Sequence, residues 1–268
     1  MNNEFEKEID FKQEINVGGR IETALSGQYE LTMKSVVKEA FHHTVRHFVS
    51  FSPAVIVLLI LQIGIIYTAL HMQLGDLQTI FKQFSDPETD FMVWNAISIA
   101  TLCNEAISAP IYVGLCMMAV SHAVGLNTQF RHIMRGFSFT LPVIVVTLLC
   151  LGAQWVSGLF LPVVPLYLSL TFTFAPLLIC EKRVSIWQAI ALSFRAVNKK
   201  IMVLAAIHIL LLLMFIVAIM FYGIGLIVVM PFFFHVKAVL YREMFGVQLK
   251  MVKRPNASPS QEVKQFDA

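Results

Sequence analysis

Charge is what this sequence has least of. Charged residues are only 14% of the 268, whereas 57% are hydrophobic; soluble domains average about 25% charged residues. No Asp, Glu, Lys or Arg occurs in residues 51–75, 137–180 or 201–236, and 91–130 contains Glu105 alone. A transmembrane helix needs roughly 20 apolar residues to cross about 30 Å of hydrocarbon. The composition therefore excludes an ordinary soluble domain.

The runs 51–75 and 91–130 predict one span each, and the longer uncharged runs 137–180 and 201–236 predict two spans each. We expect an all-α fold, a polytopic membrane bundle of six transmembrane helices in three hairpins. The predicted spans are 51–72, 96–122, 137–156, 163–180, 201–221 and 224–241. They belong to one membrane domain, 33–250. Residues 1–32 and 251–268 are polar and lack periodicity, which predicts mobile cytoplasmic tails.

Chemical motifs are also missing. The four cysteines form no CxxC pair, and no HExxH or GxGxxG occurs. No paired carboxylates, Ser–His arrangement or set of several histidines lies within the spans, so we expect no enzyme, no cofactor and no metal. Glu39, His43 and His47 share one helix face, and metal ligation there is the alternative to a face wetted by lipid headgroups.

Basic residues crowd one side of the predicted spans. The opposite side has Lys82 alone, in an acidic loop. Because Lys and Arg in short loops mark the cytoplasmic side, both termini are predicted to be cytoplasmic. These basic residues suit anionic phospholipid headgroups and give no indication of nucleic acid. The candidate lipid contacts are Lys34, Lys38, Arg46, Arg131, Arg135, Arg195, Lys199 and Lys200.

Each predicted hairpin has a proline in its returning helix: Pro110, Pro176 and Pro231. A proline removes a backbone hydrogen bond and kinks a helix. An amphipathic segment precedes each hairpin, at 34–48, 130–137 and 185–199, and suits a cytoplasmic helix in the headgroup layer. A threefold repeat of interfacial helix plus hairpin is one interpretation. The other is that such prolines and segments are ordinary in membrane proteins.

Glu105 is the one acid inside a predicted span, and intramembrane acids indicate function by default. Counting back from His122 places Glu105 near the outer interface, because a span needs only about 20 residues. The alternative is a buried carboxyl. Asn104, His208 and His235 complete the candidate intramembrane polar site. Each histidine is also explained by a hydrogen bond to a neighbouring helix.

Several short segments carry a resemblance: 187–189, 191–193, 223–225, Pro231 and 241–246, with Pro110 and Gly114 upstream. They resemble the YciC-like proteins of the bacterial inner membrane, which are similar to the membrane domain of some glycerophosphodiester phosphodiesterases. The similar features cover most of 34–246. The resemblance implies a multi-pass inner-membrane protein of unknown activity. The phosphodiesterase barrel is absent from this sequence, so its activity does not carry over.

These observations favour a non-catalytic multi-pass membrane protein that acts through lipid or protein partners. The alternative is a transporter of a small solute or lipid, with a site near Glu105 and the proline-kinked helices. A water-accessible cavity that converges on Glu105, Asn104 and either His208 or His235 would favour the alternative.

Overall fold

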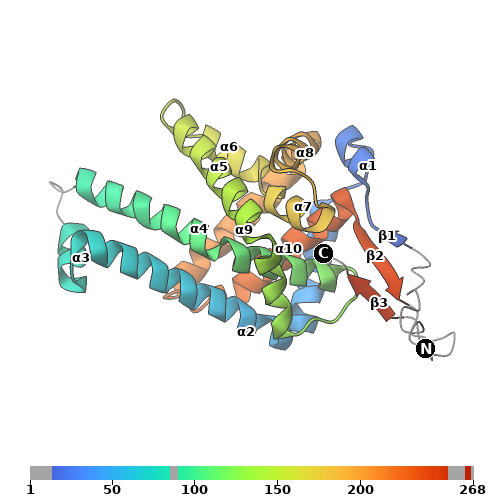
Figure 1. Ribbon diagram of the computed structural model, residues 1–268, viewed down its shortest axis with the longest axis horizontal. Coiled ribbons are helices and arrows are strands. Elements are labelled where there is room, and N and C mark those ends of the chain that lie inside the picture. Colours follow the sequence, from blue (N-terminus) through green and yellow to red (C-terminus); the bar gives the residue numbers. More distant parts are fainter. Residues whose placement is uncertain (1–13, 85–89, 253–262, 267–268) are drawn as a thin grey trace, which may run out of the picture.

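The structure is a computed structural model that describes residues 14–84, 90–252 and 263–266. It is mostly helical and elongated (Figure 1). The helices are α1 (Ile21–Ser26), α2 (Met33–Leu74), α3 (Leu77–Phe84), α4 (Asp90–Ala123), the 3-10 helix η2 (Phe130–Phe139), α5 (Thr140–Gly158), α6 (Val164–Thr171), α7 (Ala175–Lys182), α8 (Ile186–Lys199), α9 (Ile201–Met220) and α10 (Leu226–Phe245).

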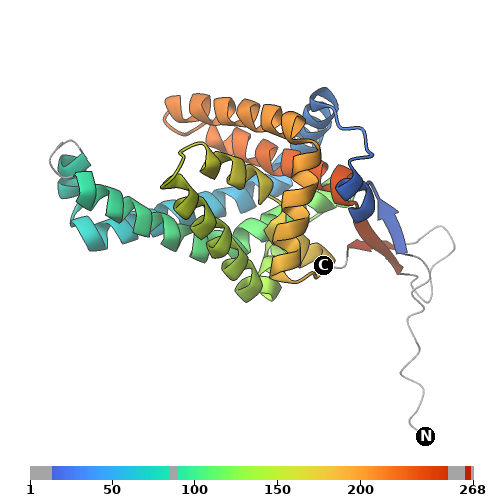
Figure 2. The ribbon, with the colours of Figure 1, turned by 90° about the horizontal axis from the view of Figure 1, so that it is seen from above.

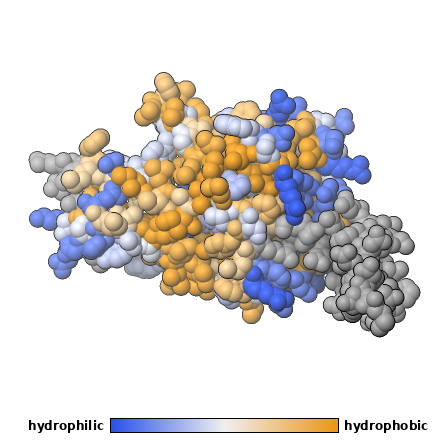
Figure 3. All heavy atoms as spheres, viewed as in Figure 1, coloured by the Kyte–Doolittle hydropathy of each residue, from blue (hydrophilic) through white to orange (hydrophobic). Residues whose placement is uncertain are grey.

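Five helical stretches in the described chain are long and apolar enough to cross a membrane: α2, α4, η2 with α5, α6 with α7, and α9. The predicted sixth span corresponds to α10, which is not among them. Its 20 residues include Lys237, Arg242 and Glu243. Figure 3 shows apolar side chains gathered across the middle of one face, with hydrophilic side chains towards both ends. This pattern is typical of a membrane-embedded bundle.

The helix α10 lies at the centre of the molecule. It packs against α2 and α4 more extensively than against its sequence neighbour α9. Figure 2 shows α9, in orange, beside the redder α10. The side chains of Phe234, His235 and Tyr241 are completely buried. Lys237 is buried as well, and the side chain of Arg242 is 12% exposed, whereas that of Glu243 is 36% exposed.

The three predicted proline kinks have different outcomes. Helices α4 and α10 continue through Pro110 and Pro231. Pro176 instead lies in the first turn of α7, and the helix is interrupted between Thr171 and Ala175. Proline suits a first turn, because its missing N–H would have no helical partner there. The fourth apolar stretch is therefore a broken helix.

Ser193 of α8 satisfies the backbone at this break. Its hydroxyl donates to the carbonyl of Thr171 over 2.6 Å and lies 3.3 Å from the backbone nitrogen of Phe174, from which it accepts. The side chain of Ser193 is completely buried. A single side chain thus replaces two backbone partners that a continuous helix would supply.

We expect Ser193→Ala to lower the free energy of unfolding by about 1–3 kcal/mol, because it leaves buried backbone groups unpaired. Ser169→Ala is the matched control, since the Ser169 hydroxyl bonds only to the carbonyl of Leu166 in its own helix. Denaturation in detergent, followed by circular dichroism, measures both. Equal stability of the two variants would contradict this role for Ser193.

The predicted tails are partly wrong. Residues 1–13, 253–262 and 267–268 lie outside the described residues, so the prediction is untested there. Within 14–32 the chain forms α1 and the strand β1 (Glu14–Val17), which pairs antiparallel with β2 (Val247–Val252). Strand β2 pairs in turn with β3 (Val263–Phe266). The pairing partner of β1 lies more than 200 residues away, beyond the reach of local periodicity.

The three amphipathic segments do not share one structure. The first is the N-terminal part of the continuous helix α2, and not a separate interfacial helix. The second is η2, which packs against α4. The third is the separate helix α8, capped by Ser185 and Gln188. The sequence itself shows this cap, because Ser-x-x-Gln at the start of a helix is a capping-box pattern. Helix α3 lies at the opposite end of the molecule from the sheet (Figure 1). The backbone N–H and the hydroxyl of Thr79 donate to the Asp76 carboxylate at the start of α3, which holds the pKa of Asp76 below its usual value.

Candidate functional site: a polar pocket between the helices

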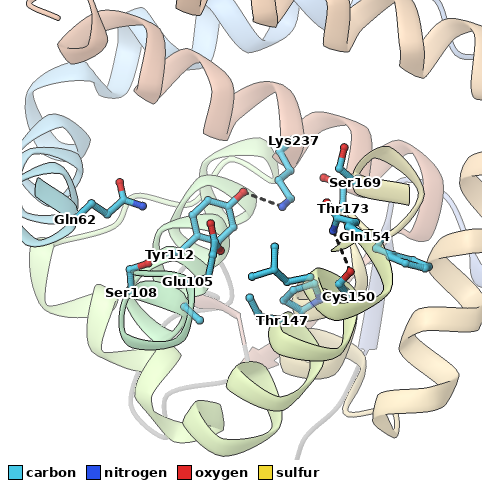
Figure 4. A pocket seen from close by; sticks show the side chains of 14 residues that line it. Gln62, Glu105, Ser108, Tyr112, Thr147, Cys150, Gln154, Ser169, Thr173 and Lys237 are labelled. Carbon is cyan, nitrogen blue, oxygen red and sulfur yellow. Dashed lines mark hydrogen bonds between the residues drawn. The ribbon is translucent and has the colours of Figure 1, made fainter. Parts of the chain in front are cut away.

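A pocket of about 320 Å³ lies inside the bundle, between α2, α4, α5, the broken helix α6–α7 and α10 (Figure 4). Its lining mixes apolar side chains with polar ones. The polar lining residues are Gln62, Glu105, Ser108, Tyr112, Thr147, Gln154, Ser169, Thr173 and Lys237. Both Phe172 and Pro176, at the helix break, also contribute to the wall. The break and the polar pocket are thus one site.

Lys237 enters the pocket from α10. Its Nζ donates a hydrogen bond of 3.0 Å to the hydroxyl of Tyr112 and lies 4.8 Å from the centre of that ring. The side chain is 7% exposed. Lysine near the end of a membrane helix commonly extends its ammonium group to the headgroups. The place of Lys237 near the end of the predicted span 224–241 predicts the same for this side chain. The prediction is wrong, because the ammonium group points into the bundle (Figure 4).

Glu105 faces the same pocket from α4. Three positions on one helix face, Glu105, Ser108 and Tyr112, line the wall together. Within the described part of the chain, the Glu105 carboxylate has neither an ion pair nor a hydrogen bond. Among the lining residues it is the one acid, and Lys237 is the one base. The pocket therefore holds two opposite charges that no direct ion pair joins.

The position of the pocket favours the buried interpretation of Glu105. Gln62, Thr147 and Phe172 line the pocket and fall near the middles of the predicted spans 51–72, 137–156 and 163–180. Helix α4 is continuous over the 34 residues from Asp90 to Ala123. Counting back about 20 residues from His122 would start the span near Leu102, but α4 has no break there that would separate an interfacial helix from the span. Glu105 therefore lies in one pocket with residues from near the middles of three predicted spans.

The other predicted members of the polar site lie elsewhere. Asn104 is buried next to Glu105, but it does not line the pocket. The ring of His208 bonds to the carbonyl of Leu204 in its own helix, over 2.9 Å. His235 is buried against α2 and α4. The structure does not bring these three residues together with Glu105.

Four histidines gather instead at the end of the bundle nearer the sheet. The rings of His122 and His235 are joined over 3.0 Å between Nδ1 and Nε2, and His47 stacks on His122 with ring centres 3.9 Å apart. His43 stacks on His235. The predicted headgroup face of α2 is thus packed into the bundle. No group of three or more His, Cys, Asp or Glu in the described chain has the geometry to hold a metal.

Sequence reasoning missed Tyr112 and Lys237 as pocket residues. One signal was available for Lys237. It ends the uncharged run 201–236, yet the apolar residues Ala238, Val239 and Leu240 follow it. A lysine followed by another apolar turn lies inside the helix, whereas a snorkelling lysine lies at its end. Tyr112 offered no such signal, because an aromatic side chain in an apolar helix is ordinary.

The candidate lipid contacts lie on the surface where they are described. The exposed side chains are Lys34, Lys38, Arg46, Arg131, Arg195 and Lys199. Lys200 is half-buried, with its Nζ 5.5 Å from the ring centre of Tyr29. The side chain of Arg135 lies outside the described set. The four cysteines are free, and Cys150 alone among them lines the pocket.

Comparisons with family models, curated proteins and solved structures find no match to this chain.

Proposed function

We propose that this protein is a non-enzymatic, multi-pass membrane protein that binds a small polar solute or a lipid headgroup in the pocket and moves it through the bundle. The pocket beside Glu105 carries the proposal. Of the polar site expected from the sequence, the pocket contains Glu105 but not Asn104, His208 or His235. Its polar lining nevertheless supports the transporter, the second of the two expected functions, over a protein that acts only through partners.

Three features support this proposal. Ligand pockets typically have volumes of about 300–1,000 Å³ and a few convergent polar groups, and this pocket of about 320 Å³ has both. Charged residues inside membrane segments commonly mark a solute path. Transporter sites are typically built at interrupted helices near the bilayer midplane, and here the break between α6 and α7 lies in the pocket wall.

The proposal includes the membrane in which the protein lies and its orientation there. We place it in a bacterial inner membrane, as a relative of the YciC-like proteins, with α10 as a sixth span and both termini cytoplasmic. The exposed basic residues of α2, η2 and α8 support this orientation. They would contact anionic phospholipid headgroups, which attract basic groups by about 1 kcal/mol each.

The natural cysteines test whether water reaches the pocket. Membrane vesicles of each orientation are treated with a membrane-impermeant thiol reagent, and mass spectrometry measures modification at each cysteine. We expect modification of Cys150, which lines the pocket, from at least one side. Cys180 is the internal control, because it is completely buried and outside the pocket.

If the protein is a transporter, the thiol reagent should reach the pocket from both sides of the membrane. As the site opens alternately, Cys150 should be modified from both sides, while Cys180 stays unmodified. Thr147→Cys adds a second reporter on the same wall. If Cys150 and the thiol introduced by Thr147→Cys are modified no faster than Cys180 from either side, the pocket is closed to solutes and the proposed function is wrong.

A further inference from the structure

The two charges of the pocket point to the chemical class of its ligand. We propose that the pocket binds a zwitterion, with the ligand's ammonium group against Glu105 and its anionic group against Lys237. The inference rests on the proposed function, since it names the substrate class of the same pocket.

The first step is that neither charge has a sufficient partner. A charge removed from water is unfavourable unless it is paired; Lys237 is buried and Glu105 is half-buried. Glu105 has no hydrogen bond or ion pair within the described part of the chain, and Lys237 has only the neutral hydroxyl of Tyr112. A lysine ammonium has three donors. At least two of them thus stay available to a ligand.

The second step is the hydrogen-bonding capacity of the other polar side chains that line the pocket. Ser108 and Ser169 already donate their hydroxyl protons to backbone carbonyls, over 2.6 Å and 2.8 Å. Their oxygens can therefore only accept from a ligand. The amide of Gln154 donates one of its two N–H groups to the carbonyl of Cys150 and keeps the other. The Ser108 oxygen is thus an acceptor on the same wall as the Glu105 carboxylate, and Lys237 is the one lining side chain whose positive charge can balance an anion.

The third step is the size of the pocket and the positions of its two charged side chains. Lys237 and Glu105 come from different helices and both point into the cavity (Figure 4). Its volume of about 320 Å³ admits a small amino acid or a phosphoethanolamine group, with room for water. These two share an ammonium group linked to an anion by a short chain. The source is either a free solute or the headgroup of a lipid.

Protection of Cys150 tests the inference on the natural, full-length protein in detergent. The rate of its modification by a neutral maleimide is measured by mass spectrometry. The probes are ω-amino acids from glycine to 6-aminohexanoate, each compared with the alkylamine and the carboxylate of the same chain length. We expect the best zwitterion to protect at least about tenfold better than either single-charge analogue, equivalent to about 1.4 kcal/mol.

Two variants assign the charges to their residues. In Glu105→Gln, the zwitterion should protect no better than the carboxylate analogue. In Lys237→Met, it should protect no better than the alkylamine. Lys237→Gln replaces the methionine variant if that variant does not fold. Glu22→Gln is the matched control, because Glu22 is exposed on α1 and should leave protection unchanged.

A second arm distinguishes the sources of the ligand. Dihexanoyl phosphatidylethanolamine is compared with dihexanoyl phosphatidylglycerol, which lacks the ammonium group. Protection by the ethanolamine lipid alone supports a headgroup, and protection by the free amino acid alone supports a solute. If maleimide reaches Cys150 but neither zwitterion exceeds its single-charge analogue, the inference is overturned and the proposed function survives. If maleimide does not reach Cys150, the proposed function itself fails.

Discussion

Replacing Gly114 with alanine should lower the free energy of unfolding by about 3 kcal/mol, the upper part of the range for overpacked cores. A Cβ at Gly114 would lie 2.2 Å from the carbonyl oxygen of Ile133 in η2. The contact is reciprocal, since a Cβ at Gly136 would lie 1.9 Å from the carbonyl oxygen of Pro110. Both obstacles are backbone atoms, so a side-chain rotation cannot relieve the overlap.

Gly64→Ala is the matched control for this prediction. Gly64 is also inside a long helix, but a Cβ there meets nothing within 4 Å. Alanine should therefore leave stability unchanged or raise it by up to about 1 kcal/mol, through helix propensity. Thermal unfolding in detergent should show a loss of roughly 5–10 °C for Gly114→Ala. A midpoint equal to that of Gly64→Ala would mean that α4 and η2 do not touch as described.

The second large effect is expected at Arg242. Its guanidinium forms a two-pronged ion pair with Glu39 of α2, with distances of 2.6 Å and 2.8 Å, and donates over 2.7 Å to the carbonyl of Ala123. One side chain thereby joins α10 to α2 and to the end of α4. The Arg242 side chain is 12% exposed and that of Glu39 is 34% exposed.

Arg242→Gln should destabilise the protein by about 2–3 kcal/mol. Removing one partner of a fully buried pair costs about 3–5 kcal/mol, and the partial exposure of Glu39 reduces this cost. Arg242→Lys should recover only part of the loss, because an ammonium group cannot bind a carboxylate with two parallel hydrogen bonds. Chemical denaturation in detergent measures both variants.

Arg46→Gln is the control for the loss of one positive charge. Arg46 is exposed on α2, and substitutions at such positions usually change stability by less than about 0.5 kcal/mol. The double variant Glu39→Gln/Arg242→Gln should lose less than the sum of the single losses, since the two residues form one contact. Full additivity would show that the pair does not couple the helices.

The contacts of Arg242 and Gly114 serve stability, whereas the charges of the pocket serve ligand binding. Arg242 and the glycine contact hold α2, α4, η2 and α10 in fixed register, so their loss should reduce stability first. The pocket shares α2, α4 and α10 with these contacts. Its carboxylate makes no ion pair or hydrogen bond within the described part of the chain, and its lysine contacts the neutral Tyr112 of α4. Buried charges without partners weaken a bundle. A ligand that pairs with both charges would offset this cost.

The sequence alone determined that the chain is built from long apolar helices, because the lengths of uncharged runs are a local property and the hydrocarbon thickness is constant. It also identified Glu105 as exceptional, and the cap of α8 at Ser185. Each of these conclusions depends on residues within a few turns of one another.

Only the tertiary structure decided what surrounds Glu105. The pocket combines residues from α2, α4, α5, α6–α7 and α10, and no sequence pattern states which helix faces meet. The same holds for Lys237, which local reasoning directed to the headgroups, and for β1, whose partner strand follows α10. Helix packing is set by contacts between distant segments, such as the backbone contact of Gly114 with η2. Those contacts place the one acid opposite the one base of the pocket.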